Sequence, residues 1–280
     1  MIGAVYNSYV EGVSIHQSNN RAITMHGVHH LRVLNNVIYK TKGHNIFIED
    51  AVETNNYCKD NLIISVTRSW SILNTDQTPA GFWITHPNNH LIGNHIGGSD
   101  RYGIWYDLKE EAQGPSAHMG GCPEFSRVGI NDNNAAHSCG RYGLRIFHNM
   151  EPRTYPCQPM VFDEMNNADP YWQNPPIETN INNFTSWKNG RNGAIAQFLG
   201  YVKFNNFKVA DNKEAGIEMS VLTLNGDYAG IFGALFIGAS ANADNETLFS
   251  APYGAMGPRS EFWQVRDSSF YSYDFNASVG

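Results

Sequence analysis

Charged side chains are scarce in this sequence of 280 residues. Lys, Arg, Asp and Glu make up 16% of it, against about a quarter in ordinary globular proteins. The formal net charge is −7, which argues against nucleic-acid binding, because nucleic-acid-binding proteins present a basic surface. No apolar run is long enough to span a membrane, and the first residues lack the charged and apolar regions of a signal peptide. We therefore expect no membrane span here, and any export signal or anchor to lie outside this chain.

Cysteine is also scarce. There are 4 cysteines and no C-x-x-C pair, which argues against a zinc ribbon or a thioredoxin-like site. Cys122, Cys139 and Cys157 share one segment, and we expect one disulfide among the three if the protein is exported. The sequence leaves the pairing open.

Three N-glycosylation acceptor triplets would come into use in an exported protein. They begin at Asn183, Asn245 and Asn276. Such triplets arise often by chance, so their meaning depends on a secretory location.

In place of charge the sequence has asparagine and glycine, which recur in a fixed order. Each repeat has Asn, usually doubled, and then Gly followed by alternating apolar residues. The repeats are Asn35-Asn36 with Gly43, Asn94 with Gly103, Asn133-Asn134 with Gly143, Asn182-Asn183 with Gly193, and Asn205-Asn206 with Gly216. Without an insertion the spacing is 22 or 23 residues, as from Gly81 to Gly103 and from Gly193 to Gly216. This period with short apolar runs is typical of a solenoid.

The repeat predicts an all-β fold, a right-handed parallel β-helix with about three short strands per coil. Asn at a corner tolerates the left-handed conformation and bonds to the Asn of the next coil, and Gly supplies a backbone angle that other residues avoid. We expect a single β-helix segment over residues 1–280, with inserted loops at 107–142 and 148–180. A leucine-rich repeat would need regularly spaced Leu, a propeller longer units, and a two-sheet sandwich would not produce the recurrence.

Several stretches of the chain resemble one known family, in the same order. They are Thr24–His30, Gly43–Asp50, Pro79–Asn89, Gly103–Tyr106 and Gly257–Phe262. Together they resemble the β-helix region of fibrocystin and fibrocystin-like proteins, which is related to that of the cell-migration-inducing and transmembrane hyaluronidases. The resemblance runs over nearly the whole chain.

The resemblance implies parallel β-helix repeats within a large ectodomain, usually with a G8 domain upstream. This chain contains no G8 domain, and Gln264–Tyr271 looks like the start of another coil. Gly114–Ser116 and Arg141–Leu144 place the chain nearer the fibrocystin-like branch. We therefore expect a fragment of a larger surface or secreted protein.

Polar side chains gather in the first third of the chain, among them His26, His30, His44, Glu49 and Asp50. Carboxylates beside histidines can serve acid–base hydrolysis of a glycosidic bond. If the protein is an enzyme, His44, Glu49 and Asp50 are the catalytic candidates, and His26 and His30 would bind the substrate. The alternative, which we favour, is that these side chains form hydrogen-bonded ladders and loop caps.

Trp105 is a further binding candidate, as an aromatic platform for a sugar ring. Aromatic residues at alternating strand positions more often pack in a core. Asp107, Glu110 and Glu111 follow it in a loop and offer the oxygen ligands that calcium prefers, but EF-hand spacing is absent. We predict no metal site and no cofactor, calcium being the one ion compatible with the sequence.

Two functions fit these features. The first is a non-enzymatic extracellular module, a structural or adhesive rod in a fibrocystin-like glycoprotein of the cell surface or a cilium coat. Its partners would be flanking domains of the same protein, an extracellular glycan or protein, or further copies in a filament or coat. The second is a glycan hydrolase acting on hyaluronan or a related acidic polysaccharide, which the hyaluronidase branch of the resemblance favours.

Overall fold

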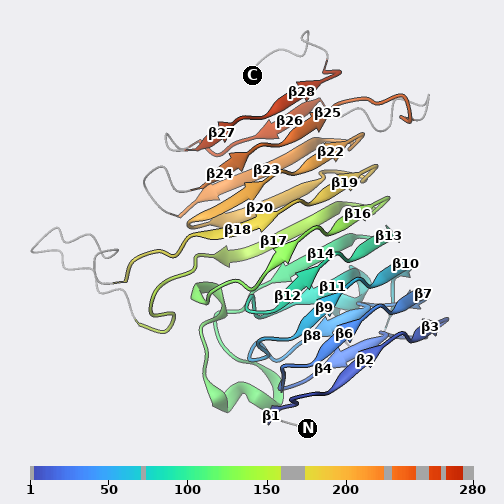
Figure 1. The fold of residues 1–280 in the computed structure, drawn as a ribbon, viewed down its shortest axis with the longest axis vertical. Coiled ribbons are helices and arrows are strands. Elements are labelled where there is room, and N and C mark those ends of the chain that lie inside the picture. Colours follow the sequence, from blue (N-terminus) through green and yellow to red (C-terminus); the bar gives the residue numbers. More distant parts are fainter. Residues whose placement is uncertain are drawn as a thin grey trace, which may run out of the picture.

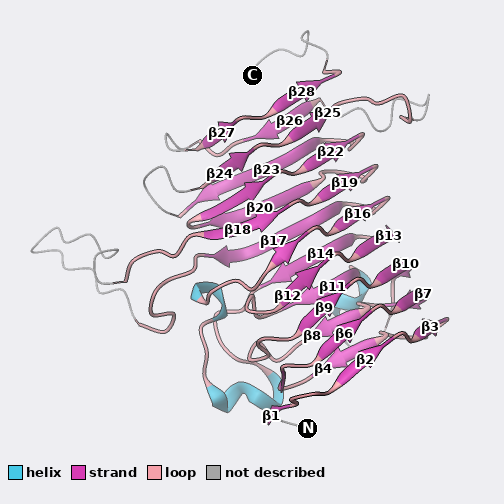
Figure 2. Ribbon diagram, viewed as in Figure 1, coloured by secondary structure: helices cyan, strands magenta, loops and turns pink. Residues whose placement is uncertain are grey.

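The computed structural model describes residues 3–70, 74–158, 174–223, 229–243, 252–259 and 263–273. Over these residues the chain winds as a parallel β-helix, whose short strands stack into three long parallel sheets (Figures 1 and 2). Each coil gives one strand to each sheet in turn, so the expected all-β solenoid is confirmed.

The strands of the three sheets follow one another in chain order. The first sheet contains β2 (Tyr9–Glu11), β6 (Arg32–Leu34), β9 (Tyr57–Lys59), β12 (His90–Ile92), β15 (Asn131–Asp132), β18 (Thr179–Asn182), β21 (Val202–Asn205), β24 (Gly230–Phe232) and β27 (Gln264–Arg266). The second contains β3 (Ser14–His16), β7 (Val37–Lys42), β10 (Leu62–Thr67), β13 (His95–Ser99), β16 (Ala135–His137), β19 (Thr185–Trp187), β22 (Lys208–Ala210), β25 (Leu235–Ile237) and β28 (Ser269–Tyr271). The third contains β4 (Ile23–Met25), β8 (Ile46–Ile48), β11 (Ala80–Ile84), β14 (Tyr102–Asp107), β17 (Tyr142–Met150), β20 (Ala194–Leu199), β23 (Ala215–Leu222) and β26 (Tyr253–Met256). A short pair, β1 (Gly3–Ala4) with β5 (Val28–His29), lies at the N-terminal end.

Aliphatic side chains fill the interior of the coils. In the second sheet Ile38, Ile63 and Ile96 are partners in register on consecutive coils and are fully buried. Like residues thus stack at the strand spacing of about 4.8 Å. Each such side chain contributes about 2 kcal/mol by leaving water.

Buried asparagines form the corner between the first and second sheets in the N-terminal half of the described chain. The residue before each of them takes the left-handed conformation, as Asn35 does with φ 53°. Each asparagine side chain donates to the next coil: Asn36 Nδ2 to Asn61 Oδ1 at 2.9 Å, Asn61 to Asn94 at 2.9 Å, and Asn94 to Asn134 at 3.0 Å. The expected asparagine ladder is therefore present over four coils.

Phenylalanine replaces the ladder asparagine farther along the chain. Phe184 and Phe207 follow left-handed Asn183 and Asn206, are fully buried, and have ring centroids 5.5 Å apart. The corner keeps its backbone conformation, while the buried groups change from hydrogen-bonded amides to phenyl rings tilted by 47°.

The recurrent glycines have a different role from the one expected. Gly43 does adopt a left-handed angle, with φ 68°. Gly103, Gly143 and Gly193 are needed instead for space, because a Cβ on each would come within 2.5, 2.7 and 2.6 Å of a carbonyl oxygen in the next coil. The expectation of a special backbone angle was wrong for these three, since the close stacking of coils is what excludes a side chain.

Two insertions leave the coil after the third sheet, and both are shorter than expected. The range 107–142 includes β15 and β16, so the first insertion is 108–130, with 3-10 helices η2 (Gly114–Met119) and η3 (Pro123–Phe125). The range 148–180 includes the end of β17 and the start of β18. The expected boundaries were too wide because the strands of these coils extend farther than expected: β15 already begins at Asn131, and β17 continues to Met150. A further 3-10 helix, η1 (Asn74–Gln77), precedes β11.

One disulfide ties the two insertions together. Cys122 and Cys157 are bonded, with their Cα atoms 5.3 Å apart. Cys139, the third candidate, stays free and buried at a corner, where burial raises the pKa of its thiol to about 12. Cys58 is free and buried as well.

Among the described residues, no helix has the length and apolar character needed to cross a membrane.

Candidate functional site

The outer face of the third sheet carries an aromatic layer. Phe47, Trp83 and Trp105 occupy the same outward position on consecutive coils and are at most 5% exposed. The rings of Phe47 and Trp83 stack with centroids 4.3 Å apart. With Tyr102 and Tyr142 they form a second hydrophobic cluster, outside the coil.

Cationic side chains cover this layer. The Arg21 guanidinium lies 3.5 Å from the ring centroid of Phe47, and that of Arg145 lies 4.6 Å from a Trp105 ring centroid. Such contacts bury the aliphatic stems and leave the charged groups over the ring faces. Trp105, a binding candidate from the sequence, is therefore packed beneath Arg145 rather than presented as a platform.

His44, a catalytic candidate, is buried in the same layer. Its ring stacks on Trp83 with centroids 5.0 Å apart, and its Nδ1 accepts a hydrogen bond from the backbone N–H of Ala80 at 3.1 Å. Burial lowers the pKa of His44 to about 3, so the ring is neutral near pH 7. A neutral imidazole that is packed on all sides is suited to a structural role.

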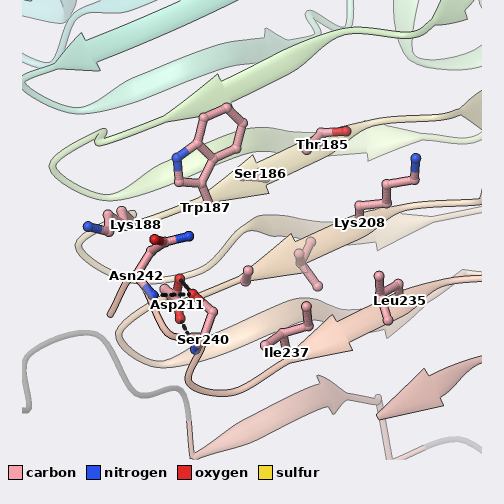
Figure 3. Close-up of a pocket in the computed structure, with 12 residues that line it drawn as sticks. Thr185, Ser186, Trp187, Lys188, Lys208, Asp211, Leu235, Ile237, Ser240 and Asn242 are labelled. Atoms are coloured by element: carbon pink, nitrogen blue, oxygen red, sulfur yellow. Dashed lines mark hydrogen bonds between the residues drawn. The ribbon is translucent and has the colours of Figure 1, made fainter. Parts of the chain in front are cut away.

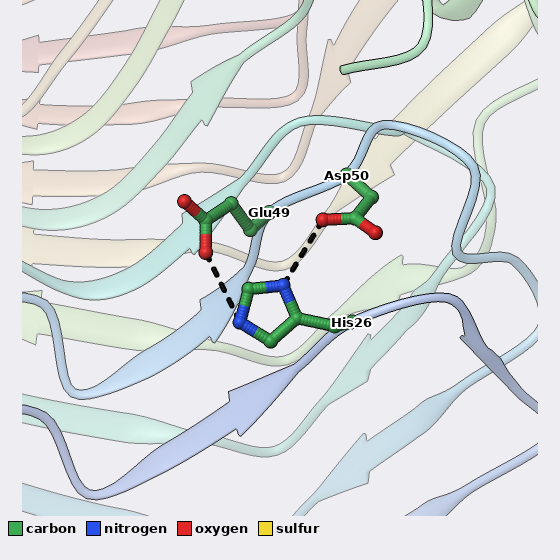
Figure 4. Close-up of side chains that lie close together, drawn as sticks. All are labelled: His26, Glu49 and Asp50. Atoms are coloured by element: carbon green, nitrogen blue, oxygen red, sulfur yellow. Dashed lines mark hydrogen bonds and ion pairs between the residues drawn. The ribbon is translucent and has the colours of Figure 1, made fainter. Parts of the chain in front are cut away.

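The histidine that meets the two carboxylates is His26 (Figure 4). It follows β4, and Glu49 and Asp50 follow β8 on the next coil. His26 Nδ1 lies 3.0 Å from Asp50 Oδ1, and His26 Nε2 lies 3.2 Å from Glu49 Oε2. The structure thus brings together Glu49 and Asp50 as the sequence predicted, with His26 in place of His44.

The three side chains differ in access to solvent. The His26 side chain is 46% exposed and that of Glu49 25%, whereas Asp50 is 1% exposed. Burial is the main cause that raises the pKa of Glu49 above its ordinary value. Because both ring nitrogens of His26 face carboxylate oxygens, and a neutral imidazole has one N–H, the cluster holds an extra proton when both contacts are hydrogen bonds. The arrangement is therefore able to give and take a proton at the surface.

The first insertion reaches back to this cluster. It runs along the coils toward the N-terminal end of the molecule (Figure 1). There Ser116 of η2 donates its hydroxyl to Asp50 Oδ2 at 2.6 Å, and the Gln113 N–H donates to the Asp50 carbonyl at 2.8 Å. Sequence reasoning missed this contact, because Ser116 lies 66 residues beyond Asp50 and no local pattern connects the two.

Two further charged groups support the cluster. Arg21 lies 3.7 Å from Glu49 and 3.2 Å from buried Asp76. Glu53 is fully buried, and its Oε1 accepts backbone N–H groups from Gly27 at 2.9 Å and from Asp50 at 3.0 Å. Glu53 therefore fixes the backbone on both coils, and Arg21 partly balances the negative charge of Glu49.

The donor atoms of His26, Glu49 and Asp50 lie within 4.8 Å of one another. One imidazole nitrogen and two carboxylates form an ordinary ligand set for a transition metal or zinc. Calcium takes oxygen ligands and usually more of them. The donor set is thus compatible with a divalent cation, and it suits calcium less well.

The acidic loop after Trp105 does not gather its carboxylates. Asp107 is buried, accepts from Trp83 Nε1 at 3.1 Å and pairs with Lys109 at 2.6 Å. Glu110 and Glu111 instead line an open pocket of about 410 Å³ beside Lys109. The charge of Asp107 is already satisfied within the protein.

The remaining candidates lie apart from the cluster. His30 stacks on Tyr6 with ring centroids 4.7 Å apart. Asn183 is exposed at a corner, where its side chain donates to Asp132 at 2.7 Å. Asn245 and Asn276 lie outside the described residues.

Comparison with known proteins gives consistent results. The family model of the CEMIP β-helix matches residues 1–144. Fibrocystin-L of Mus musculus is 35% identical over 98% of this chain. Among human proteins, the cell surface hyaluronidase CEMIP2 is 32% identical over 75% of the chain, and the cell migration-inducing and hyaluronan-binding protein is 27% identical over 89%.

The match covers a small part of each relative. The chain spans 6% of the length of fibrocystin-L, 18% of the cell surface hyaluronidase and 21% of the hyaluronan-binding protein. The activities that these names describe therefore belong to much longer polypeptides.

Proposed function

Because this chain belongs to the CEMIP β-helix family, we propose that it is a non-enzymatic β-helix module of a large fibrocystin-like protein outside the cell, acting as a structural and recognition rod. The observation that carries the proposal is the unbroken parallel stacking of strands in all three sheets along the described chain, with one register shift between β17 and β20. Each coil supports its neighbours, so the array gains length and stiffness without a catalytic site.

The use of the buried polar groups supports the same function. Asn36, Asn61 and Asn94 bond coil to coil, Glu53 binds backbone N–H groups, and His44 is neutral within an aromatic stack. Polar groups that bond from coil to coil in the interior, as these asparagines and Glu53 do, give a unique and rigid register.

Two features support an extracellular location. Disulfides persist in oxidising compartments, and Cys122 is bonded to Cys157. The acceptor Asn183 is exposed, as glycosylation requires. As part of a larger fibrocystin-like protein, the rod would have flanking domains on either side. It would lie at the cell surface or in a cilium coat.

The test of this proposal is a depolymerisation assay. Purified chain, shown to be folded by circular dichroism, is incubated with size-defined hyaluronan or chondroitin, and product length is read on a gel. Runs contain calcium, zinc or a chelator. We expect intact polymer under all conditions, and shortening of either polymer by the wild-type chain would refute a non-enzymatic role.

A second candidate function, glycan hydrolysis, is favoured by the His26–Glu49–Asp50 cluster. Two carboxyl groups in different environments can divide acid and base roles, and the raised pKa of Glu49 suits a proton donor. Asp50, held by Ser116 and His26, would be the second carboxyl group of the pair.

The variants that test hydrolysis are Glu49→Gln and a matched control, Glu11→Gln on exposed β2. If the wild-type chain shortens hyaluronan, Glu49→Gln should reduce the rate by about a hundredfold or more, while Glu11→Gln should leave it unchanged. Equal loss in both variants would remove the cluster from consideration as the site.

A further inference from the structure

The outer face of the second sheet is uncharged along one whole row. The row starts at His16, the third residue of β3, and continues through the residue in register with it on each of the other eight strands. None of these nine outward residues is acidic, a lysine or an arginine. Tyr39, Ile64 and Tyr271 of this row are 41, 37 and 58% exposed. Of the described residues after β25, Ser240 and Asn242 border this row near its C-terminal end.

Two hollows interrupt the row. In the lower one, Gly97 stands between Ile64 and His137 on neighbouring coils. In the upper one, Ala210 stands between Trp187 and Ile237 (Figure 3). The small residue at Ala210 leaves a recess of about 480 Å³. At Gly97 the His137 ring leans over the glycine, 3.1 Å from where a Cβ would lie, and a hollow of about 430 Å³ is bordered by that ring, Ile64 and His95.

The hollows are regularly placed along the rod. Gly97 belongs to β13 and Ala210 to β22, three coils apart, which corresponds to about 14 Å. Between them the rings of His137 and Trp187 stack in parallel, with centroids 4.2 Å apart and 11° between planes. Along the rod, the face therefore presents one recess, then the stacked rings of His137 and Trp187, and then a second recess.

The dimensions of the face suit a narrow ligand. Nine strands at about 4.8 Å, and two outward rows about 7 Å apart, give an area on the order of 300 Å². A stable protein interface needs about 800 Å² on each partner. The face is thus long and narrow, a shape that matches a linear ligand better than the broad contact of a folded protein.

The chemistry of the hollows suits an uncharged ligand with both apolar and hydroxyl surfaces. Burial lowers the pKa of His95 and of His137, so both are neutral near pH 7. Asp211 is 3% exposed, and its carboxylate accepts two hydrogen bonds from Ser240, at 2.6 and 2.7 Å. Lys188 and Lys208 border the upper hollow on different sides, and each can donate to a ligand hydroxyl (Figure 3).

We propose that this face binds a linear neutral oligosaccharide along the axis of the rod. The apolar C–H faces of its sugar rings lie in the two recesses and against Trp187, and its hydroxyl edges meet Lys208 and Ser240 at the rim. Binding sites of this kind combine an apolar floor with a few placed polar groups. The site goes beyond the proposed rod function, and it lies on a different sheet from His26, so its failure would leave the depolymerisation result unaffected.

The test is a titration of the purified chain with cellohexaose and with chitohexaose, followed by tryptophan fluorescence and calorimetry. We expect saturable binding of at least one hexasaccharide, with little dependence on salt. Ala210→Ile fills the upper recess with the residue type that Ile237 already provides one coil away, and it should weaken binding by about tenfold or more. Lys59→Ile, on exposed β9 of the first sheet, is the matched control and should bind like the wild type.

Four outcomes would overturn the proposal. They are no binding of either hexasaccharide by folded protein, equal binding by Ala210→Ile and wild type, binding only of a hyaluronan hexasaccharide that is lost in salt, and a dimer in sedimentation that Ala210→Ile dissociates. The last outcome would assign the face to a second copy of the chain.

Discussion

At the scale of single residues, burial separates the ionisable groups of the N-terminal coils into two kinds. His44 and Glu53 are fully buried and bond to the backbone, whereas His26 and Glu49 reach solvent and face each other. Only the second kind can exchange protons with a ligand. The aromatic layer decides this division, because it covers His44 and leaves His26 at its edge.

The pH dependence of stability tests the assignment of His44. Its pKa is 6.5 when unfolded and about 3 when folded, so between these values only the unfolded chain holds the proton. The stabilisation is therefore present above about pH 6.5 and is lost as the pH falls toward 3. His44→Phe should be less stable at pH 7, because the Ala80 N–H loses its acceptor, yet its free energy of unfolding should fall less on acidification. Urea unfolding of both proteins at pH 7 and pH 5 measures this. An equal drop in the free energy of unfolding of the two proteins between these pH values would contradict the prediction.

At the scale of elements, the sequence predicts the corners better than the insertions. A doubled asparagine predicts a left-handed residue at this corner, which follows from local chemistry. It does not decide what fills the ladder position, which is Asn36 in one coil and Phe184 in another. The insertion boundaries and the Ser116–Asp50 contact depend on how a long segment folds back over the coils, which no local pattern encodes. The same limit applies to the site. Glu49 and Asp50 are adjacent in sequence and stay together, whereas choosing His26 over His44 requires the register between coils.

The asparagine ladder makes a prediction about neighbouring coils. Asn94 Nδ2 donates to Asn134 Oδ1 and to the Cys58 carbonyl, and Asn94 Oδ1 accepts from Asn61. Asn94→Ala leaves buried partners unbonded and should lower the free energy of unfolding by about 3 kcal/mol. Asn205→Ala, in a half-buried position, should lower it by about 1 kcal/mol or less. Equal losses in urea unfolding would show that burial of the ladder contributes nothing extra.

At the scale of the whole molecule, each coil packs against the coils before and after it, and a coil at either end of the described array packs against one. Burial follows this: every residue of β14 is buried, while β3 is mostly and β28 wholly exposed. In a solenoid, stability is a sum of coil and interface contributions.

Hydrogen exchange tests how far this sum holds for the β-helix. The backbone N–H groups of β14, between β11 and β17, should exchange most slowly, and those of β3 and β28 fastest, because opening a terminal coil breaks one interface and opening a central coil breaks two. Mass spectrometry of peptides from all three regions in one sample provides its own internal control. Equal protection throughout would mean that the ladders and the aromatic layer couple the coils into one cooperative unit, so that a ligand bound at Trp187 would stabilise His26 as strongly as its own coil.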